Sequence, residues 1–128
     1  MPIWERIIDA ENFEFLREGK KKVEACIPNP ANPAEDYKKI AEGNLMRFKC
    51  RETGKILNRK ILSCRYYKTL ENFCIEEGIE RISPKSKTLG DLIRDLYKNN
   101  KETYKFIEFR GLYAVTLKDA NSPPESNK

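Results

Sequence analysis

The sequence predicts an α+β fold, a small domain of β-strands with flanking helices, and three of its segments support this prediction. Residues 45–63 contain two runs of strand-forming side chains joined by a turn, and residues 88–98 have the apolar spacing of a helix. Residues 12–27 have the pattern of a short helix that leads into a strand. The chain of 128 residues and 15.0 kDa has a mean hydropathy of -0.74, so we expect one domain, over residues 1–118, with a small core.

The first predicted elements are a strand and a helix. The strand covers Trp4 to Ile8. Asp9 is expected to cap the helix, because its carboxylate can accept hydrogen bonds from the free amides of the first helical turn. The helix runs to about Glu18, and Phe13 and Leu16 are its predicted inward pair.

Gly19 predicts the turn from this helix into a strand, because glycine adopts the left-handed conformation after a helix at the least cost. Three lysines, Lys20 to Lys22, follow at the joint. The next residues alternate between two sets, which predicts a half-buried strand with its charged face outward. The apolar set is Val23, Ala25 and Ile27, and the other set is Lys22, Glu24 and Cys26.

A predicted hairpin occupies the middle of the chain. Residues 28–36 carry three prolines and two asparagines and should form a loop, after which residues 37–42 lead to a turn at Gly43. Residues 45–50 and 55–63 then read as two strands joined through residues 51–54. A turn centred on Thr53 and Gly54 would place Arg47 opposite Lys60 and Phe48 opposite Arg59. This pairing would create a basic face, for which the alternative interpretation is an ordinary solvated surface.

Two helices are predicted in the second half of the chain. Thr69 can cap the first, which should end at Gly78. Thr88 and Asp91 resemble a capping box at the start of the second, and the asparagines at positions 99 and 100 should end it. The apolar face of this second helix comprises Leu89, Leu92, Ile93, Leu96 and Tyr97.

The last predicted strands surround Gly111. Residues 106–117 should contain one or two strands, with Gly111 as either a bulge or a hairpin turn. Residues 119–128 include two adjacent prolines and no large apolar side chain, so we expect a disordered tail there.

Composition excludes several kinds of chemistry. The sequence has no histidine, which excludes Ser-His-Asp and Cys-His mechanisms and removes the commonest nitrogen ligand for metals. The four cysteines, Cys26, Cys50, Cys64 and Cys74, lack the spacing of a metal site, so we expect no metal, and no cofactor is expected either. Because an intracellular setting argues against disulfides, we expect four reduced, mostly buried thiols. The net charge of +5 and the pI near 9.0 favour polyanionic partners.

Membrane helices and secretory signals each have a characteristic sequence pattern. No stretch approaches the roughly 20 apolar residues that a membrane helix requires, and the first residues lack the pattern of a secretory signal. We therefore expect an intracellular location, cytoplasmic or nuclear, without a membrane partner.

Residues 19–26 resemble the ASCH domains, small relatives of the PUA-like RNA-binding barrels, which are marked by the pattern Gly-x-Lys-x-x-Glu-x-Arg. Gly19, Lys21 and Glu24 match this pattern, and Cys26 stands at the arginine position. The resemblance spans roughly residues 3–119 and implies a PUA-like β-barrel with flanking helices. Further features follow in the family's order: the preceding helix, Gly43-Asn44, the run at 67–73, and the closing strand at 112–117.

The resemblance implies a binding cleft between the first helix and the barrel, which in the family is thought to accept RNA or a nucleotide. Lys21 can offer an ammonium group to a phosphate or a base carbonyl, and Glu24 can accept hydrogen bonds from an exocyclic amine or a ribose hydroxyl. The thiol of Cys26 cannot replace a guanidinium group, and Arg47, Lys49 and Arg110 are candidates for the missing charge. Tyr66, Tyr67 and Tyr104 are candidates for base stacking, although core packing explains them equally well.

We therefore expect a non-catalytic module that binds single-stranded RNA or a nucleotide, and a monomer is the expected state. The side chains of Lys20 and Lys22 would add attraction that salt screens. The expected ligand-binding residues are Gly19, Lys20, Lys21, Lys22, Glu24, Tyr67 and Arg110.

Three other interpretations remain open. Some small ASCH-like proteins hydrolyse N4-acetylcytidine with a lysine, a threonine and a glutamate, and in such an amidohydrolase Lys21 and Glu24 would be the catalytic pair. Glu24, however, stands at the position of the threonine, and the glutamate has no clear match. A protein-interaction module is the second alternative. Without the resemblance, a weak surface ion pair between Lys21 and Glu24 is the simplest interpretation.

Overall fold

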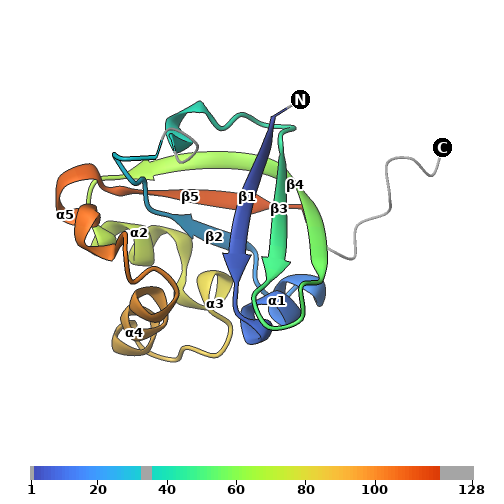
Figure 1. The fold of residues 1–128 in the computed structure, drawn as a ribbon. Coiled ribbons are helices and arrows are strands. Elements are labelled where there is room, and N and C mark those ends of the chain that lie inside the picture. The colour runs from blue at the N-terminus through green and yellow to red at the C-terminus, as the bar shows by residue number, and fades with distance from the viewer. Residues whose placement is uncertain (1, 33–35, 119–128) are drawn as a thin grey trace.

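The computed structural model describes residues 2–32 and 36–118, which form an α+β fold built on one mixed five-stranded sheet (Figure 1). The strand order is β1-β3-β4-β5-β2, in which β1 and β3 are parallel and the other neighbours are antiparallel. The sheet curls into a half-barrel, and we call its open side, between the edge strands β1 and β2, the seam. The strands are β1 (Ile3–Ile8), β2 (Val23–Cys26), β3 (Leu45–Cys50), β4 (Ile56–Tyr67) and β5 (Leu112–Leu117).

Helices flank this sheet in two places. Figure 1 shows α1 at the end of β1 and β3, whereas α2, α3 and α4 gather on one side of β2 and β5. The α-helices are α1 (Ala10–Arg17), α2 (Leu70–Glu77), α3 (Ile79–Ile82), α4 (Leu89–Asn99) and α5 (Ile107–Arg110). Two 3-10 turns, η2 (Tyr37–Lys39) and η3 (Tyr104–Phe106), complete the described elements.

The predicted helix caps are confirmed. The carboxylate of Asp9 accepts a hydrogen bond from the backbone N–H of Asn12 at 2.8 Å. Thr88 and Asp91 form a reciprocal capping box at the start of α4. Gly78 ends α2 with a φ of 88°, in the left-handed region that glycine tolerates.

The predicted hairpin forms, but its predicted register is wrong by two residues. Arg47 pairs with Asn58, and Phe48 pairs with Leu57. The turn is centred between Glu52 and Thr53, because Gly54 (φ 76°) closes the loop instead of standing at its centre. The basic pairs that the earlier register implied are therefore absent from this ladder.

Strand β4 is longer than predicted and serves both halves of the sheet. Its first half pairs with β3, and its second half pairs with β5. A register shift between Ile61 and Ser63 separates the two halves, and irregularities of this kind bend a strand. The bend allows one strand to run through the curve of the half-barrel.

Two apolar clusters fill the fold. The barrel core lies within the curve of the sheet, and the helix-side core lies between β2, β5 and the helices. The barrel core comprises Ile8, Phe13, Leu16, Cys26, Tyr37, Ile40, Met46, Phe48, Cys50, Ile61, Val115 and Leu117. The helix-side core comprises Val23, Ala25, Ile27, Phe73, Cys74, Ile82, Leu92, Leu96, Ile107, Leu112 and Ala114.

These two cores correct the prediction that β2 has an outward charged face. Every residue of β2 is buried, because the strand is sandwiched between the cores. Val23 and Ala25 face the helix-side core, and Cys26 faces the barrel core. Glu24 is consequently a buried carboxylate within an apolar strand.

The segment around Gly111 also differs from the prediction. Residues 107–110 form the short helix α5 instead of a strand, and Gly111 ends it with a φ of 68°. Gly111 is therefore neither a bulge nor a hairpin turn. The short helix α3, which directly follows Gly78, is likewise an element that was not predicted.

Two predicted segments lie partly or wholly outside the described residues. These are residues 33–35 of the predicted loop and the whole predicted tail, residues 119–128. Within residues 2–32 and 36–118, no helix is long and apolar enough to cross a membrane. All four cysteines are free thiols, of which Cys64 is half-buried and the other three are buried.

Candidate ligand-binding cleft

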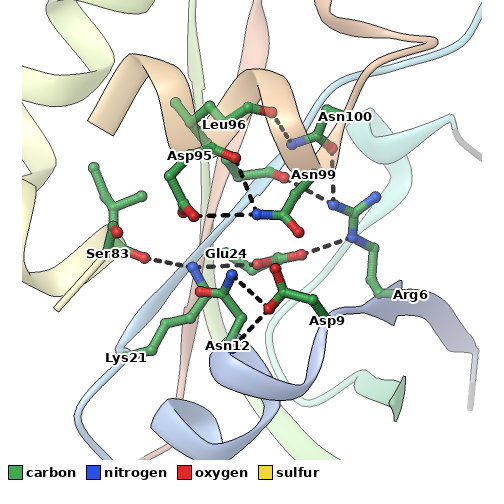
Figure 2. Close-up of polar contacts among 12 residues, drawn as sticks. Arg6, Asp9, Asn12, Lys21, Glu24, Ser83, Asp95, Leu96, Asn99 and Asn100 are labelled. Atoms are coloured by element: carbon green, nitrogen blue, oxygen red, sulfur yellow. Dashed lines mark hydrogen bonds and ion pairs between the residues drawn. The ribbon is translucent and has the colours of Figure 1, made fainter. Parts of the chain in front are cut away.

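The joint between α1 and β2 brings Lys21 into the interior beside the seam. Gly19 turns the chain with a φ of 79°, and the backbone N–H groups of Lys20 and Lys21 both donate to the carbonyl of Phe15. This arrangement directs the side chain of Lys21 inward, where only 5% of it is exposed. Its ammonium group donates to the carbonyl of Ile82 and lies 3.5 Å from a carboxylate oxygen of Glu24 (Figure 2).

Arg6 joins the two edges of the seam. Its Nε donates to Glu24 at 2.8 Å, and its Nη2 donates to the carbonyl of Ala25 at 3.2 Å. Burial opposes the charge of this guanidinium group, but the carboxylate of Glu24 more than offsets that effect, so the pKa of Arg6 is raised well above its ordinary value. A side chain thus provides the link that no backbone ladder provides between β1 and β2.

Cys26 lies on the same strand but brings no charge. Burial raises the pKa of its thiol to about 12, so the group is neutral at physiological pH. The guanidinium group beside Glu24 comes instead from Arg6, on the opposite edge of the seam.

The C-terminal end of α4 completes the cluster. Asn100 accepts a hydrogen bond from Arg6 at 3.2 Å and donates to the carbonyl of Leu96 at 2.9 Å. Asn99 donates to the backbone carbonyl of Asp95 at 2.9 Å and to its carboxylate at 3.3 Å. Figure 2 shows these side chains of α4 converging on Arg6 and Glu24 from β1 and β2.

Two neighbouring hollows border this cluster, and together we call them the cleft. The inner cavity has a volume of about 20 Å³ and is lined by Lys21, Glu24 and Asp95 among others. The outer groove, of about 480 Å³, is open to solvent. Arg6, Asn99 and Asn100 line both hollows and therefore form the boundary between them.

The outer groove is more basic than acidic. Its charged lining residues are four basic and two acidic side chains: Arg6, Arg51, Lys98, Lys101, Glu5 and Glu102. Tyr37 contributes an aromatic side chain, which is almost fully buried. An anionic ligand in the groove would consequently meet an excess of positive charge.

The predicted site residues occupy three different places. Lys21 and Glu24 meet in the inner cavity, but they form a buried pair and not the surface pair of the simplest interpretation. Lys20 is exposed and lines a separate hollow of about 880 Å³ with Arg81 and Lys87. The backbone of Lys22 bonds to Arg81 and Leu117, which ties the joint to α3 and β5.

Tyr67 and Arg110 lie away from this cluster. Tyr67 pairs with Leu112 at the start of β5, and Arg110 comes just before that strand. Lys21 lies beyond the other end of β5, roughly 20 Å away along the strand. The hydroxyl of Tyr67 donates to Glu77 at 2.5 Å, in a network that fixes α2 to the sheet.

Sequence reasoning missed Arg6, Asn99 and Asn100 as members of the cluster. A signal for Arg6 was present, because Trp4, Arg6 and Ile8 are the inward positions of β1 and an inward arginine needs a buried partner. The two asparagines were assigned only to the helix end. Among residues 2–32 and 36–118, no group of three or more cysteine or carboxylate residues could hold a metal ion.

Comparison with known proteins identifies the fold. No family model matches the sequence, and no curated protein matches it. The crystal structure of hypothetical protein PH0355 has a TM-score of 0.73 and 24% identity, covering 92% of this chain and 99% of that chain. The solution structure of protein PF0455 from Pyrococcus furiosus has a TM-score of 0.65 and 22% identity, covering 94% of this chain and 100% of that chain. These similarities show a shared half-barrel fold, without indicating a ligand.

Proposed function

We propose that this protein is an ASCH-like, PUA-like module that binds single-stranded RNA or a nucleotide in the cleft, without catalysis. The observation that carries the proposal is the buried Arg6–Glu24–Lys21 cluster, whose Arg6 also lines a basic groove. Buried charged groups beside an open hollow are uncommon away from functional sites, because their burial costs free energy.

The size and the charge of the outer groove support this ligand class. Its volume of about 480 Å³ falls within the range of small-molecule sites. Lys98 and Lys101 lie on the helix-end side of the groove, where a phosphate group can meet them. The polar groups at the boundary, on Arg6, Asn99 and Asn100, can then contact the edge of a base.

The proposal is tested by titrating labelled single-stranded oligonucleotides at two salt concentrations. We expect binding that weakens as salt rises. Lys98→Ala and Lys101→Ala should each reduce the slope of log affinity against log salt by about 0.7, the value for one lost phosphate contact on a single strand. Lys68→Ala is the matched control, because it removes an exposed charge near Tyr67, at the far end of the sheet, and should leave the slope unchanged.

Two results would contradict the proposal. Undetectable binding at low salt would show that single-stranded RNA is not a ligand. Equal effects of all three lysine variants would show that binding depends on diffuse surface charge and not on the groove. Hydrolysis of N4-acetylcytidine by the wild type, abolished by Lys21→Ala, would replace the binding module with the amidohydrolase.

A further inference from the structure

We propose that the cleft selects nucleobases that carry an exocyclic amino group, and that the side-chain oxygen of Asn99 is the atom that accepts from this group. The inference rests on the proposed function and adds base preference to it. It would make the cleft favour adenine over hypoxanthine and cytosine over uracil.

The orientation of the Asn99 amide is fixed by Asp95. The nitrogen of the amide donates to the backbone carbonyl of Asp95 at 2.9 Å and to a carboxylate oxygen of Asp95 at 3.3 Å. The opposite orientation would place the amide oxygen against two acceptors, which is unfavourable. The oxygen of Asn99 must therefore point away from Asp95, as Figure 2 shows.

This oxygen is buried and accepts no hydrogen bond from the described residues. A buried acceptor without a donor is costly, so a ligand that supplies an N–H group gains free energy there. Nearby donors already have other acceptors. Arg6 donates to Glu24, Ala25 and Asn100, the amide of Asn100 donates to Leu96, and Lys21 donates to Ile82.

The position and size of the inner cavity suit an amino group on a larger ring. Asn99 lines both the cavity and the groove, so a base in the groove can direct one substituent across the boundary. The cavity, at about 20 Å³, has room for one small polar group. Two cations, Arg6 and Lys21, and two carboxylates, Glu24 and Asp95, line the same cavity, so a neutral amino group leaves their charges balanced.

The alternative bases present the wrong group to this atom. Hypoxanthine and uracil have a carbonyl oxygen where adenine and cytosine have an amino group. A carbonyl oxygen directed at Asn99 would place two acceptors together and leave both without a donor. A site with a buried polar atom rejects such analogues because that atom stays unpaired.

The test measures the affinity of the wild-type protein for matched nucleoside 5′-monophosphates by calorimetry. We expect AMP to bind at least about tenfold more tightly than IMP, and CMP to show the same preference over UMP. The N4,N4-dimethyl derivative of CMP keeps the ring but lacks an N–H donor, and it should bind as weakly as UMP. Asn99→Leu should remove the AMP preference while retaining the salt dependence of binding.

The ligand series keeps the inference testable even if Asn99→Leu fails to fold. Equal affinities for AMP and IMP, with binding detected for both, would overturn the amino-group preference and leave the proposed function standing. Failure of all the nucleotides and of labelled oligonucleotides to bind would overturn the proposed function and the preference together.

Discussion

The contact between Arg6 and Glu24 is a buried, charged link between the two edges of the sheet. It links β1 to β2 across the seam, and its two side chains are 15% and 6% exposed. Removing one partner of a buried pair leaves the other charge without compensation, which is far costlier than the loss of a surface pair. Arg6 also lies at the boundary between the two hollows of the cleft, so the effects of this contact on stability and on binding should be measured together.

We predict that Arg6→Met lowers the free energy of unfolding by about 3 kcal/mol, because the buried side chain of Glu24 would lose its closest cation. Glu24→Gln should lower the free energy of unfolding much less in the Arg6→Met variant than in the wild-type protein. The double variant should therefore lose at least about 1 kcal/mol less than the sum of the single variants, as measured by urea denaturation.

A matched control is available on the surface of α1. Arg17 and Glu14 form an ion pair at 2.6 Å, but their side chains are 55% and 48% exposed. The corresponding cycle, with Arg17→Met and Glu14→Gln, should show a much smaller coupling, because solvent screens exposed pairs. Additive effects of the Arg6 and Glu24 changes would show that the seam is not held by this pair.

At the scale of elements, α5 depends on the way in which Gly111 joins it to β5. Gly111 has a φ of 68°, and a Cβ atom there would collide with the backbone carbonyl of Tyr67 and lie 2.6 Å from the hydroxyl of Tyr66. Only glycine allows β4 to pass this close. The residue is consequently required both for its backbone conformation and for its small size.

We predict that Gly111→Ala lowers the free energy of unfolding by more than about 2 kcal/mol, since the backbone carbonyl of Tyr67 cannot move aside as a flexible side chain would. Gly90→Ala is the opposite case. Gly90 lies in the first turn of α4, and its added Cβ would meet nothing closer than 3.7 Å. This variant should gain up to about 1 kcal/mol of stability from helix propensity. Thermal unfolding of the two variants measures whether Gly90→Ala raises stability and Gly111→Ala lowers it.

At the scale of the whole molecule, the sequence predicted the features that depend on neighbouring residues. The caps at Asp9 and Thr88 and the helix end at Gly78 are set by residues within a few positions, and all are confirmed. The register of the hairpin was wrong, because it depends on which loop position the glycine occupies. Local patterns do not determine such choices.

The candidate site was less predictable, because it is assembled from distant segments. Lys21 and Glu24 could be found through the family pattern, but their partner Arg6 is 18 positions from Glu24 and sits on another strand. Asn100 is 94 positions from Arg6. The burial of both faces of β2 could not be foreseen either, since helices from the second half of the chain cover one of them.

The sharing of β2 and β5 between the two cores has a consequence for how the protein unfolds. Each strand contributes side chains to the barrel core and to the helix-side core, so neither core can lose its packing while the other keeps its full set of contacts. We therefore predict one cooperative transition. Trp4 is the single tryptophan and packs on the barrel core, so its fluorescence should report the same denaturation midpoint as the far-ultraviolet circular dichroism of the helices. Two separate midpoints would mean that one core can unfold while the other keeps its packing around the shared strands.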